Sequence, residues 1–129
     1  MKEQVFYYCK HCGNLATKLN DSGVDMVCCG EEMQVLTANT RDGAREKHIP
    51  EVEVNKDMVK VQVGSVLHPM VPEHYIEWVV LQTNKGFQVH YLQPGEEPKA
   101  EFKLVSGEKV LAVYEYCNLH GLYKTVVKA

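Results

Sequence analysis

Short segments in which hydrophobic and polar residues alternate dominate the chain from Val52 onward. Residues 59–63 read Val-Lys-Val-Gln-Val, a period of two that is typical of a half-buried β-strand. Residues 75–83 predict a second strand, with Ile76, Trp78 and Val80 on one face. We therefore expect this part of the chain to form a sheet structure.

The remaining pattern continues in the same way. Asn84-Lys85-Gly86 is a hairpin signal that leads into a strand over 87–92. A loop over 93–98 precedes three further hydrophobic segments, at 100–105, 109–116 and 122–127. Six or seven short strands with regular turns and no convincing helix predict an antiparallel β-sandwich.

The first 37 residues predict a separate small module. Cys9 and Cys12 form a Cys-x2-Cys metal knuckle followed by a glycine, whereas Cys28 and Cys29 are adjacent, so we expect a distorted tetrahedron. Four thiolates suit zinc or iron, and a bound metal would stabilise a segment too short to bury a sufficient core. The alternative is four free buried cysteines. The polar residues 38–45 are expected to form the linker.

Composition limits the possible functions. The 129 residues are 45% hydrophobic and 24% charged, with a formal charge of −3, as in an ordinary globular protein. No basic patch interleaved with aromatic residues favours nucleic-acid binding, and no apolar run is long enough to span a membrane. Because the chain starts without an apolar signal segment and its cysteines cluster as metal ligands do, we expect a reducing, cytoplasmic location.

A second group of potential metal ligands lies in the region of predicted strands. Cys117 and His120 are three positions apart and precede Gly121, an arrangement typical of ligands on a tight loop. Three further histidines lie at predicted strand ends or in loops: His48, His68 and His74. Because His68 precedes a proline, and His48 lies two residues before one, we expect extended backbone to fix their rings.

These five donors exceed the four ligands of a usual zinc site. Imidazoles plus one thiolate, with a sixth position open, favour iron that binds a small oxidant. Backbone N–H groups in the turn after Cys117 are expected to donate to its sulfur. Glu46 and Lys47 precede His48, so a cation could attract a small anion to the site, although a plain solvated ion pair is an equal alternative.

Two other histidines are not expected to bind the metal. His11 lies inside the first knuckle, where the cysteines are the better ligands, and His90 shares the Gln88 face of its strand, where we expect it to be solvated. Each of the four chosen histidines could also be an unrelated surface or core residue, but their association with a Cys-x2-His loop argues against this interpretation.

Two other functional classes fit part of the pattern. A non-catalytic electron carrier of cupredoxin type also uses a β-sandwich, but its copper site needs about two histidines, one cysteine and a weak axial methionine, and no methionine follows His120. A zinc-ribbon interaction module accounts for the first four cysteines and leaves Cys117 unexplained. Both remain alternatives to a five-ligand iron site.

In this order, the motifs resemble those of desulfoferrodoxin, the two-iron form of superoxide reductase, over essentially the whole chain. Residues 1–37 are similar to the desulforedoxin domain through Cys-x2-Cys and the vicinal Cys-Cys pair. Residues 38–129 are similar to the neelaredoxin-type domain. The segments that carry this second resemblance are 46–50, 64–70, 74–78 and 115–121. The family fold implies an immunoglobulin-like sandwich for residues 38–129.

The resemblance implies two irons per chain. One would bind the four thiolates of the first module, where zinc is also possible, and the other would have four imidazoles in the plane and Cys117 as axial ligand. At its open position, superoxide would be reduced by one electron to hydrogen peroxide. Lys47 matches the family lysine that attracts superoxide and helps its protonation, and Glu46 the glutamate that can occupy the sixth position of the oxidised iron.

The family also implies a homodimer and a rubredoxin-like electron donor. Departures from the family pattern are modest: residues 71–73 read Val-Pro-Glu where many relatives carry a more charged segment, and Tyr123 replaces a frequent tryptophan. Neither change involves a predicted ligand. They affect only the electric field around the pocket, and hence the rate at which an anion arrives.

Overall fold

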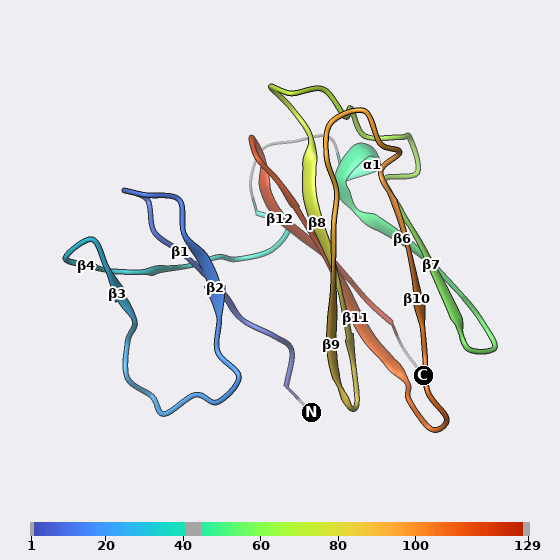
Figure 1. The fold of residues 1–129 in the computed structure, drawn as a ribbon, viewed down its shortest axis with the longest axis horizontal. Coiled ribbons are helices and arrows are strands. Elements are labelled where there is room, and N and C mark those ends of the chain that lie inside the picture. The colour runs from blue at the N-terminus through green and yellow to red at the C-terminus, as the bar shows by residue number, and fades with distance from the viewer. Residues whose placement is uncertain (1, 41–44, 128–129) are drawn as a thin grey trace. The chain divides into compact units, whose positions relative to one another are not determined.

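A computed structural model describes residues 2–40 and 45–127 of the chain. The described residues are almost entirely β (Figure 1), which confirms the predicted fold class. They divide into two compact units, residues 2–37 and the residues from Ala38 onward. Of the expected linker over 38–45, residues 41–44 lie outside the described residues.

The N-terminal unit is a small arrangement of antiparallel strands. Its strands are β1 (Phe6–Tyr8), β2 (Leu15–Thr17), β3 (Val27–Cys28), β4 (Glu31–Glu32) and β5 (Gln34–Val35). Strand β1 pairs with β2 on one side and β5 on the other, and β3 pairs with β4 in a separate hairpin. Its buried apolar residues include Phe6, Cys9 and Met33. Such a small core suits a unit stabilised by a metal.

The second unit is a sandwich of two antiparallel sheets. Its strands are β6 (Pro50–Asn55), β7 (Met58–Val63), β8 (Ile76–Thr83), β9 (Gly86–Tyr91), β10 (Lys99–Lys103), β11 (Val110–Cys117) and β12 (Gly121–Val126). The three-stranded sheet has the order β10-β7-β6 and the four-stranded sheet β12-β11-β8-β9. One hydrophobic cluster joins them, with residues such as Val61 and Phe102 from the first sheet and Leu81 and Val113 from the second.

The expectation of no helix was wrong at one place. Residues Arg45–His48 form the short helix α1, closed by a 2.9 Å hydrogen bond from the Ile49 N–H to the Arg45 carbonyl. Four residues are too few to produce a visible helical period in the sequence. None of the described helices is long and apolar enough to cross a membrane.

The predicted common face of Ile76, Trp78 and Val80 was also wrong, for Ile76 alone. Ile76 pairs with Cys117, but Trp78 pairs with the preceding residue, Tyr116, so strand β8 contains one extra residue at Glu77. This β-bulge reverses the alternation. Ile76 therefore belongs to the same interior cluster as Val79 and Leu81, and Trp78 lies on the opposite face of the sheet.

Candidate metal centres

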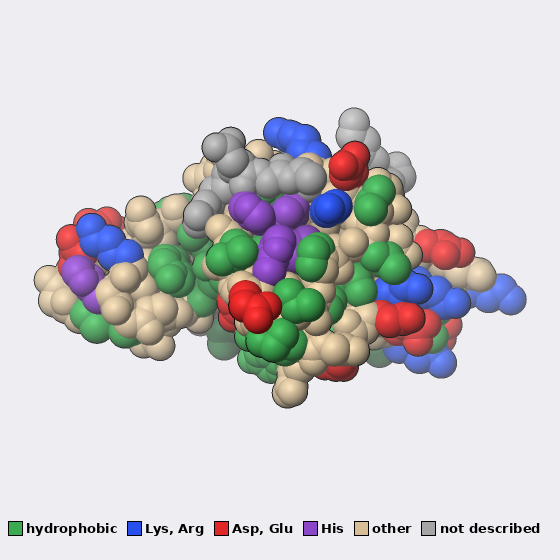
Figure 2. Space-filling view, turned by 90° about the horizontal axis from the view of Figure 1, so that it is seen from above, with side chains coloured by type: hydrophobic (Ala, Val, Ile, Leu, Met, Phe, Trp, Pro, Cys, Tyr) green, Lys and Arg blue, Asp and Glu red, His purple; other side chains and the backbone are tan. Residues whose placement is uncertain are grey.

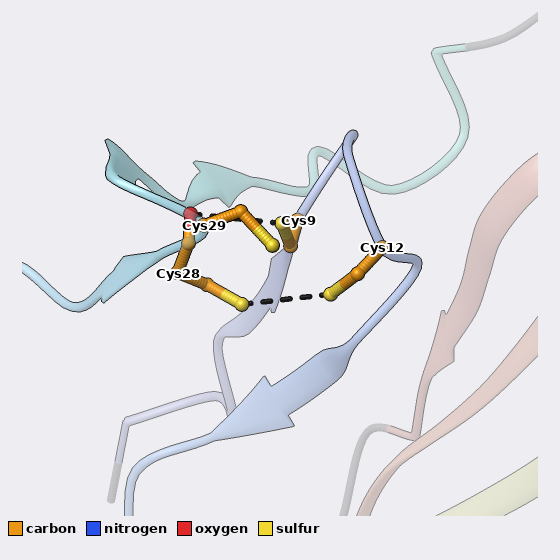
Figure 3. A group of neighbouring side chains, drawn as sticks. All are labelled: Cys9, Cys12, Cys28 and Cys29. Carbon is orange, nitrogen blue, oxygen red and sulfur yellow. Dashed lines mark hydrogen bonds between the residues drawn. The ribbon is translucent and has the colours of Figure 1, made fainter.

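The first candidate centre contains four thiols from two turns of the N-terminal unit. Cys9 and Cys12 lie on the turn between β1 and β2, Cys28 ends β3, and Cys29 follows it in the turn to β4 (Figure 3). The four sulfurs lie within 4.8 Å of one another, and those of Cys12 and Cys28 are 3.5 Å apart. Metal–sulfur bonds of about 2.3 Å in a tetrahedron place sulfurs about 3.8 Å apart, so the group fits one metal ion.

The electrostatics of these thiols also favours a cation. Backbone N–H groups of Cys12 and His11 donate to the Cys9 sulfur and lower the pKa of Cys9 to about 6. Hydrogen bonds with the other three sulfurs raise the pKa of Cys29 to about 12, because negative charge accumulates in the group. Four thiolates cannot ionise together without a cation, and a bound metal supplies that charge.

His11 does not join this group. Its Nε2 lies 2.5 Å from a carboxylate oxygen of Glu31, which links the turn between β1 and β2 to β4. Lys10 lies 3.6 Å from the other oxygen of the same carboxylate. The sequence-based exclusion of His11 is consistent with this position, which holds the two cysteine-bearing turns together from outside.

The second candidate centre brings together the five donors predicted from the sequence. The Nε2 atoms of His48 and His68 are 3.0 Å apart, and the His48 Nε2 lies 3.2 Å from the His120 Nδ1. Cys117 Sγ is 3.9 Å from the same His120 atom. Donor atoms of His48, His74, Cys117 and His120 all lie within 4.8 Å of one another. Bonds of about 2.1 Å place neighbouring nitrogens about 3 Å apart.

Separate elements of the sandwich deliver these five side chains. His48 ends α1, His68 and His74 lie on the segment between β7 and β8, Cys117 ends β11, and His120 lies in the turn before β12. The imidazole of His48 is buried and stacks on Tyr123, with ring centroids 4.6 Å apart. Each of the five side chains therefore lies at an element end or in a connecting segment that the sheets hold in place.

Gly64 allows α1 to approach the end of β7. Its φ is +84°, and a Cβ at this position would lie 2.4 Å from the Val66 carbonyl oxygen and 2.6 Å from that of Glu46. Only glycine adopts this backbone conformation without strain and leaves space for the helix. The N–H groups of Gly64 and Val66 then donate to the carbonyls of Ile49 and Glu46.

The protonation state of His68 suits a metal ligand. Its Nδ1 lies 2.7 Å from the Pro69 carbonyl oxygen, which only accepts, so Nδ1–H is the donor and the Nε2 lone pair faces the other imidazoles. Burial lowers the pKa of His68 to about 4 and also lowers the pKa of His74. Neutral imidazoles at neutral pH can donate their lone pairs to a metal.

The sulfur of Cys117 is fully buried in this site. Burial raises the pKa of Cys117, and backbone N–H groups of Leu119 and His120 donate to its sulfur, as expected from the sequence. The buried Glu115 adds a group that the sequence reasoning missed. Among the described residues neither of its carboxylate oxygens has a hydrogen-bond partner, and burial raises its pKa well above the usual value.

Asn118 is a second residue whose function the sequence reasoning missed. Its Oδ1 accepts the Tyr75 N–H at 3.0 Å, its Nδ2 donates to the Glu73 carbonyl at 3.0 Å, and its own N–H donates to the Tyr75 carbonyl at 3.3 Å. The turn that carries Cys117 and His120 is thereby tied to the segment that carries His74. An asparagine between two ligands in a turn is the signal that could have indicated this position.

The two α1 residues that precede His48 differ in their exposure. Lys47 is half-buried, and its charge contributes, after burial and the His120 imidazole, to the lowered pKa of His74. Glu46 is exposed, and no described contact brings its carboxylate to the imidazoles. His90, which was expected to be solvated, is half-buried near Phe102, with ring centroids 6.2 Å apart.

Both donor groups fit metal ions by their chemistry and spacing. The His74 Nε2 is buried and has no hydrogen-bond partner among the described residues, a costly arrangement unless a ligand occupies it. His74 and His120 are partly exposed, whereas Cys117 is not. Figure 2 shows a group of histidine side chains near the centre of this face, with hydrophobic side chains beside them. The residues with exposed apolar side chains in these segments are Val66, Leu67, Val71 and Leu119.

Comparison with known proteins identifies relatives over most of the chain. The desulfoferrodoxin family model matches residues 40–126. A desulfoferrodoxin of Nitratidesulfovibrio vulgaris is 48% identical over 118 residues, which are 92% of each chain. A superoxide reductase from Treponema pallidum, known as a crystal structure, is 42% identical with a TM-score of 0.81, covering 96% of this chain and 99% of that one. A superoxide reductase (1Fe-SOR) from Giardia intestinalis is 30% identical with a TM-score of 0.56, covering 65% of this chain and 99% of that one.

Proposed function

Because the chain belongs to the desulfoferrodoxin family, an iron-binding family, we propose that it is a superoxide reductase that converts superoxide to hydrogen peroxide in a one-electron reduction. The relatives described as superoxide reductases support the assignment of this chain to the oxidoreductase class. The observation that carries the specific reaction is the convergence of His48, His68, His74, Cys117 and His120 on one point, with the imidazole side facing solvent.

These five side chains would hold a ferrous ion, which when bound supplies the electron, with the thiolate raising its electron density. The chain itself controls access and protons. Because the sulfur is buried and His74 and His120 are partly exposed, the small anion arrives from the imidazole side. The Lys47 ammonium attracts it and donates a hydrogen bond from Nζ. Two protons are taken up for each superoxide reduced, and no dioxygen is released.

The remaining roles extend the same proposal. The Cys9, Cys12, Cys28 and Cys29 group would hold a second iron, or zinc, and would make residues 1–37 a desulforedoxin-like domain beside a catalytic domain over 38–129. Glu46 is the candidate to occupy the open position after oxidation. A rubredoxin-like donor, a homodimer and a cytoplasmic location stay predictions from the sequence.

A non-catalytic electron carrier is the alternative function. The number of grouped imidazoles argues against it. Four rings lie together, with centroids 4.5–6.3 Å apart, whereas a copper carrier needs only two histidines. An enclosed metal would also suit a carrier better than one with partly exposed ligands.

The experiment that tests the proposal mixes the reduced, iron-loaded protein with a pulse of superoxide. We expect rapid decay of superoxide with formation of hydrogen peroxide and no dioxygen. The Cys117→Ser variant should lose this reaction and the visible thiolate-to-iron absorption of the second centre, while keeping iron in the four-cysteine group. Release of dioxygen, or an unchanged reaction in the variant, would contradict the proposal.

A further inference from the structure

A surface cavity beside the β8 bulge is not used by the proposed reaction. It has a volume of about 460 Å³, within the lower range of small-molecule sites. Aromatic side chains and one carboxylate contribute to its wall. The lining residues are Tyr75, Glu77, Trp78, Tyr91, Leu92, Gln93 and Pro94.

The bulge explains why a charged residue lies among these rings. Because Glu77 is the extra residue of β8, the alternation of side chains is interrupted and Glu77 and Trp78 line the same cavity. Trp78 is further fixed by stacking on Tyr116, with ring centroids 5.7 Å apart and planes 12° from parallel. The aromatic wall and the carboxylate are therefore held by the sheet itself.

The charge of Glu77 is not balanced within the described part of the chain, where no ion pair includes it. Its side chain is half-buried, and burial raises the pKa of its carboxyl. A cation in the cavity would offset the cost of holding this carboxylate ionised and partly buried without a counter-ion. In contrast, Tyr91 exposes 75% of its surface, so one aromatic side of the cavity is open to a ligand from solution.

Electron-rich ring faces together with a carboxylate are the features that recognise methylated ammonium groups, which bind poorly to sites that offer hydrogen bonds alone. We infer that this cavity is a binding site for a small organic cation of the quaternary ammonium class, held by Tyr75, Trp78 and Tyr91 with Glu77 as counter-ion. The inference does not depend on the superoxide reductase proposal, because it uses no metal ligand.

The test titrates the iron-loaded protein with choline and with its uncharged isostere 3,3-dimethylbutanol. Trp78 is the sole tryptophan of the chain, so a change in tryptophan fluorescence reports this cavity, and calorimetry measures the affinity independently. We expect saturable binding of choline and at least about tenfold weaker binding of the neutral isostere.

Variants distinguish a built site from a nonspecific apolar surface. Glu77→Gln and Tyr91→Leu should each weaken choline binding about tenfold, whereas Tyr91→Phe, which keeps the ring, should not. Glu101→Gln, an exposed glutamate on β10 outside this cavity, is the matched control and should bind like the wild type. Iron content and circular dichroism of every variant check that the fold is intact.

Four results would overturn the inference, of which three concern choline and its isostere. These are equal binding of the neutral isostere, undiminished binding in a folded Glu77→Gln variant, and the absence of saturable choline binding at millimolar concentration. Binding of methylguanidinium without choline would also overturn it, since that result would identify the cavity as a receptor for an arginine side chain of a protein partner.

Discussion

The side chain of Asn118 holds His74 in place by hydrogen bonding to the residues on either side of it, Glu73 and Tyr75. The Asn118 side chain accepts a hydrogen bond from the Tyr75 N–H and donates one to the Glu73 carbonyl, both at 3.0 Å. Since Asn118 lies in the turn between Cys117 and His120, one side chain ties together the segments that contribute three of the five donors. The precision of the centre therefore depends on a residue that does not itself bind metal.

We expect Asn118→Ala to weaken metal retention at the second centre by roughly 10- to 100-fold, as do other changes in groups that orient ligands. Competition with a chelator, followed through the visible absorption of this centre, measures the effect. Asn118→Asp is the matched variant, because it keeps the acceptor for Tyr75 and loses the donor to Glu73. An intermediate loss is expected, and wild-type retention in Asn118→Ala would exclude this role.

Lys47→Ala should slow superoxide capture by about tenfold and flatten its dependence on ionic strength, because the positive charge that precedes the ligand His48 in α1 no longer attracts the anion. Rate constants measured at several salt concentrations test this expectation. Iron content should be unchanged, since Lys47 is not among the donors. Lys85→Ala, in the hairpin between β8 and β9, is the control and should keep the salt profile of the wild type.

Cys12→Ser should damage the N-terminal unit and spare most of the reductase activity, because the two donor groups lie in separate compact units. We expect loss of metal from the four-cysteine group and increased proteolysis within residues 2–37. Superoxide decay and metal content, measured on the same sample, separate the two effects. Loss of turnover with a fully loaded second centre would show that the units are coupled.

The carboxylate of Glu108 predicts a pH dependence of stability. Thr83 Oγ1 donates to it at 2.6 Å and the Val105 N–H at 3.0 Å, and these bonds, in that order, lower the pKa of Glu108. A depressed folded-state pKa means that the stabilisation is present above the unfolded value, near pH 4.3, and is lost as the pH falls through the folded value.

We therefore expect Glu108→Gln to lower the melting temperature by a few degrees at pH 7 and to have a progressively smaller effect as the pH falls through the lowered folded-state pKa, below which the wild-type carboxyl is also protonated. Thermal unfolding across this pH range is the measurement. Glu53→Gln, an exposed carboxylate on β6, should change little at any pH in this range. An equal loss at every pH would assign the effect to packing.

The sequence predicted which side chains group together more accurately than it predicted the local structure around them. The cysteines and histidines chosen from the sequence are the nine side chains that the structure brings into two groups, because ligand chemistry restricts residue types strongly; that they bind metal stays a prediction. The alternation of Val59, Val61 and Val63 likewise predicted strand β7 and its buried face. Local patterns are sufficient to predict a strand and its buried face where side chains alternate regularly between the two faces of a sheet.

The sequence was insufficient where tertiary pairing decides the outcome. The bulge at Glu77 depends on the register between β8 and β11, and no local pattern records it. Helix α1 was missed because a single turn is fixed by its contacts with Gly64 and Val66, far along the chain. Asn118 was considered only for its backbone, although its side chain makes the connection between two loops.

The close approach at Gly64 limits which residue this position tolerates. With carbonyl oxygens within 2.6 Å of the Cβ that any other residue would carry, a side chain here would push the backbone of α1, which ends at His48, away from the end of β7. The position of one of the five donors therefore depends on the absence of a single methyl group. A relative that keeps every donor but lacks this glycine is expected to assemble the second group less accurately.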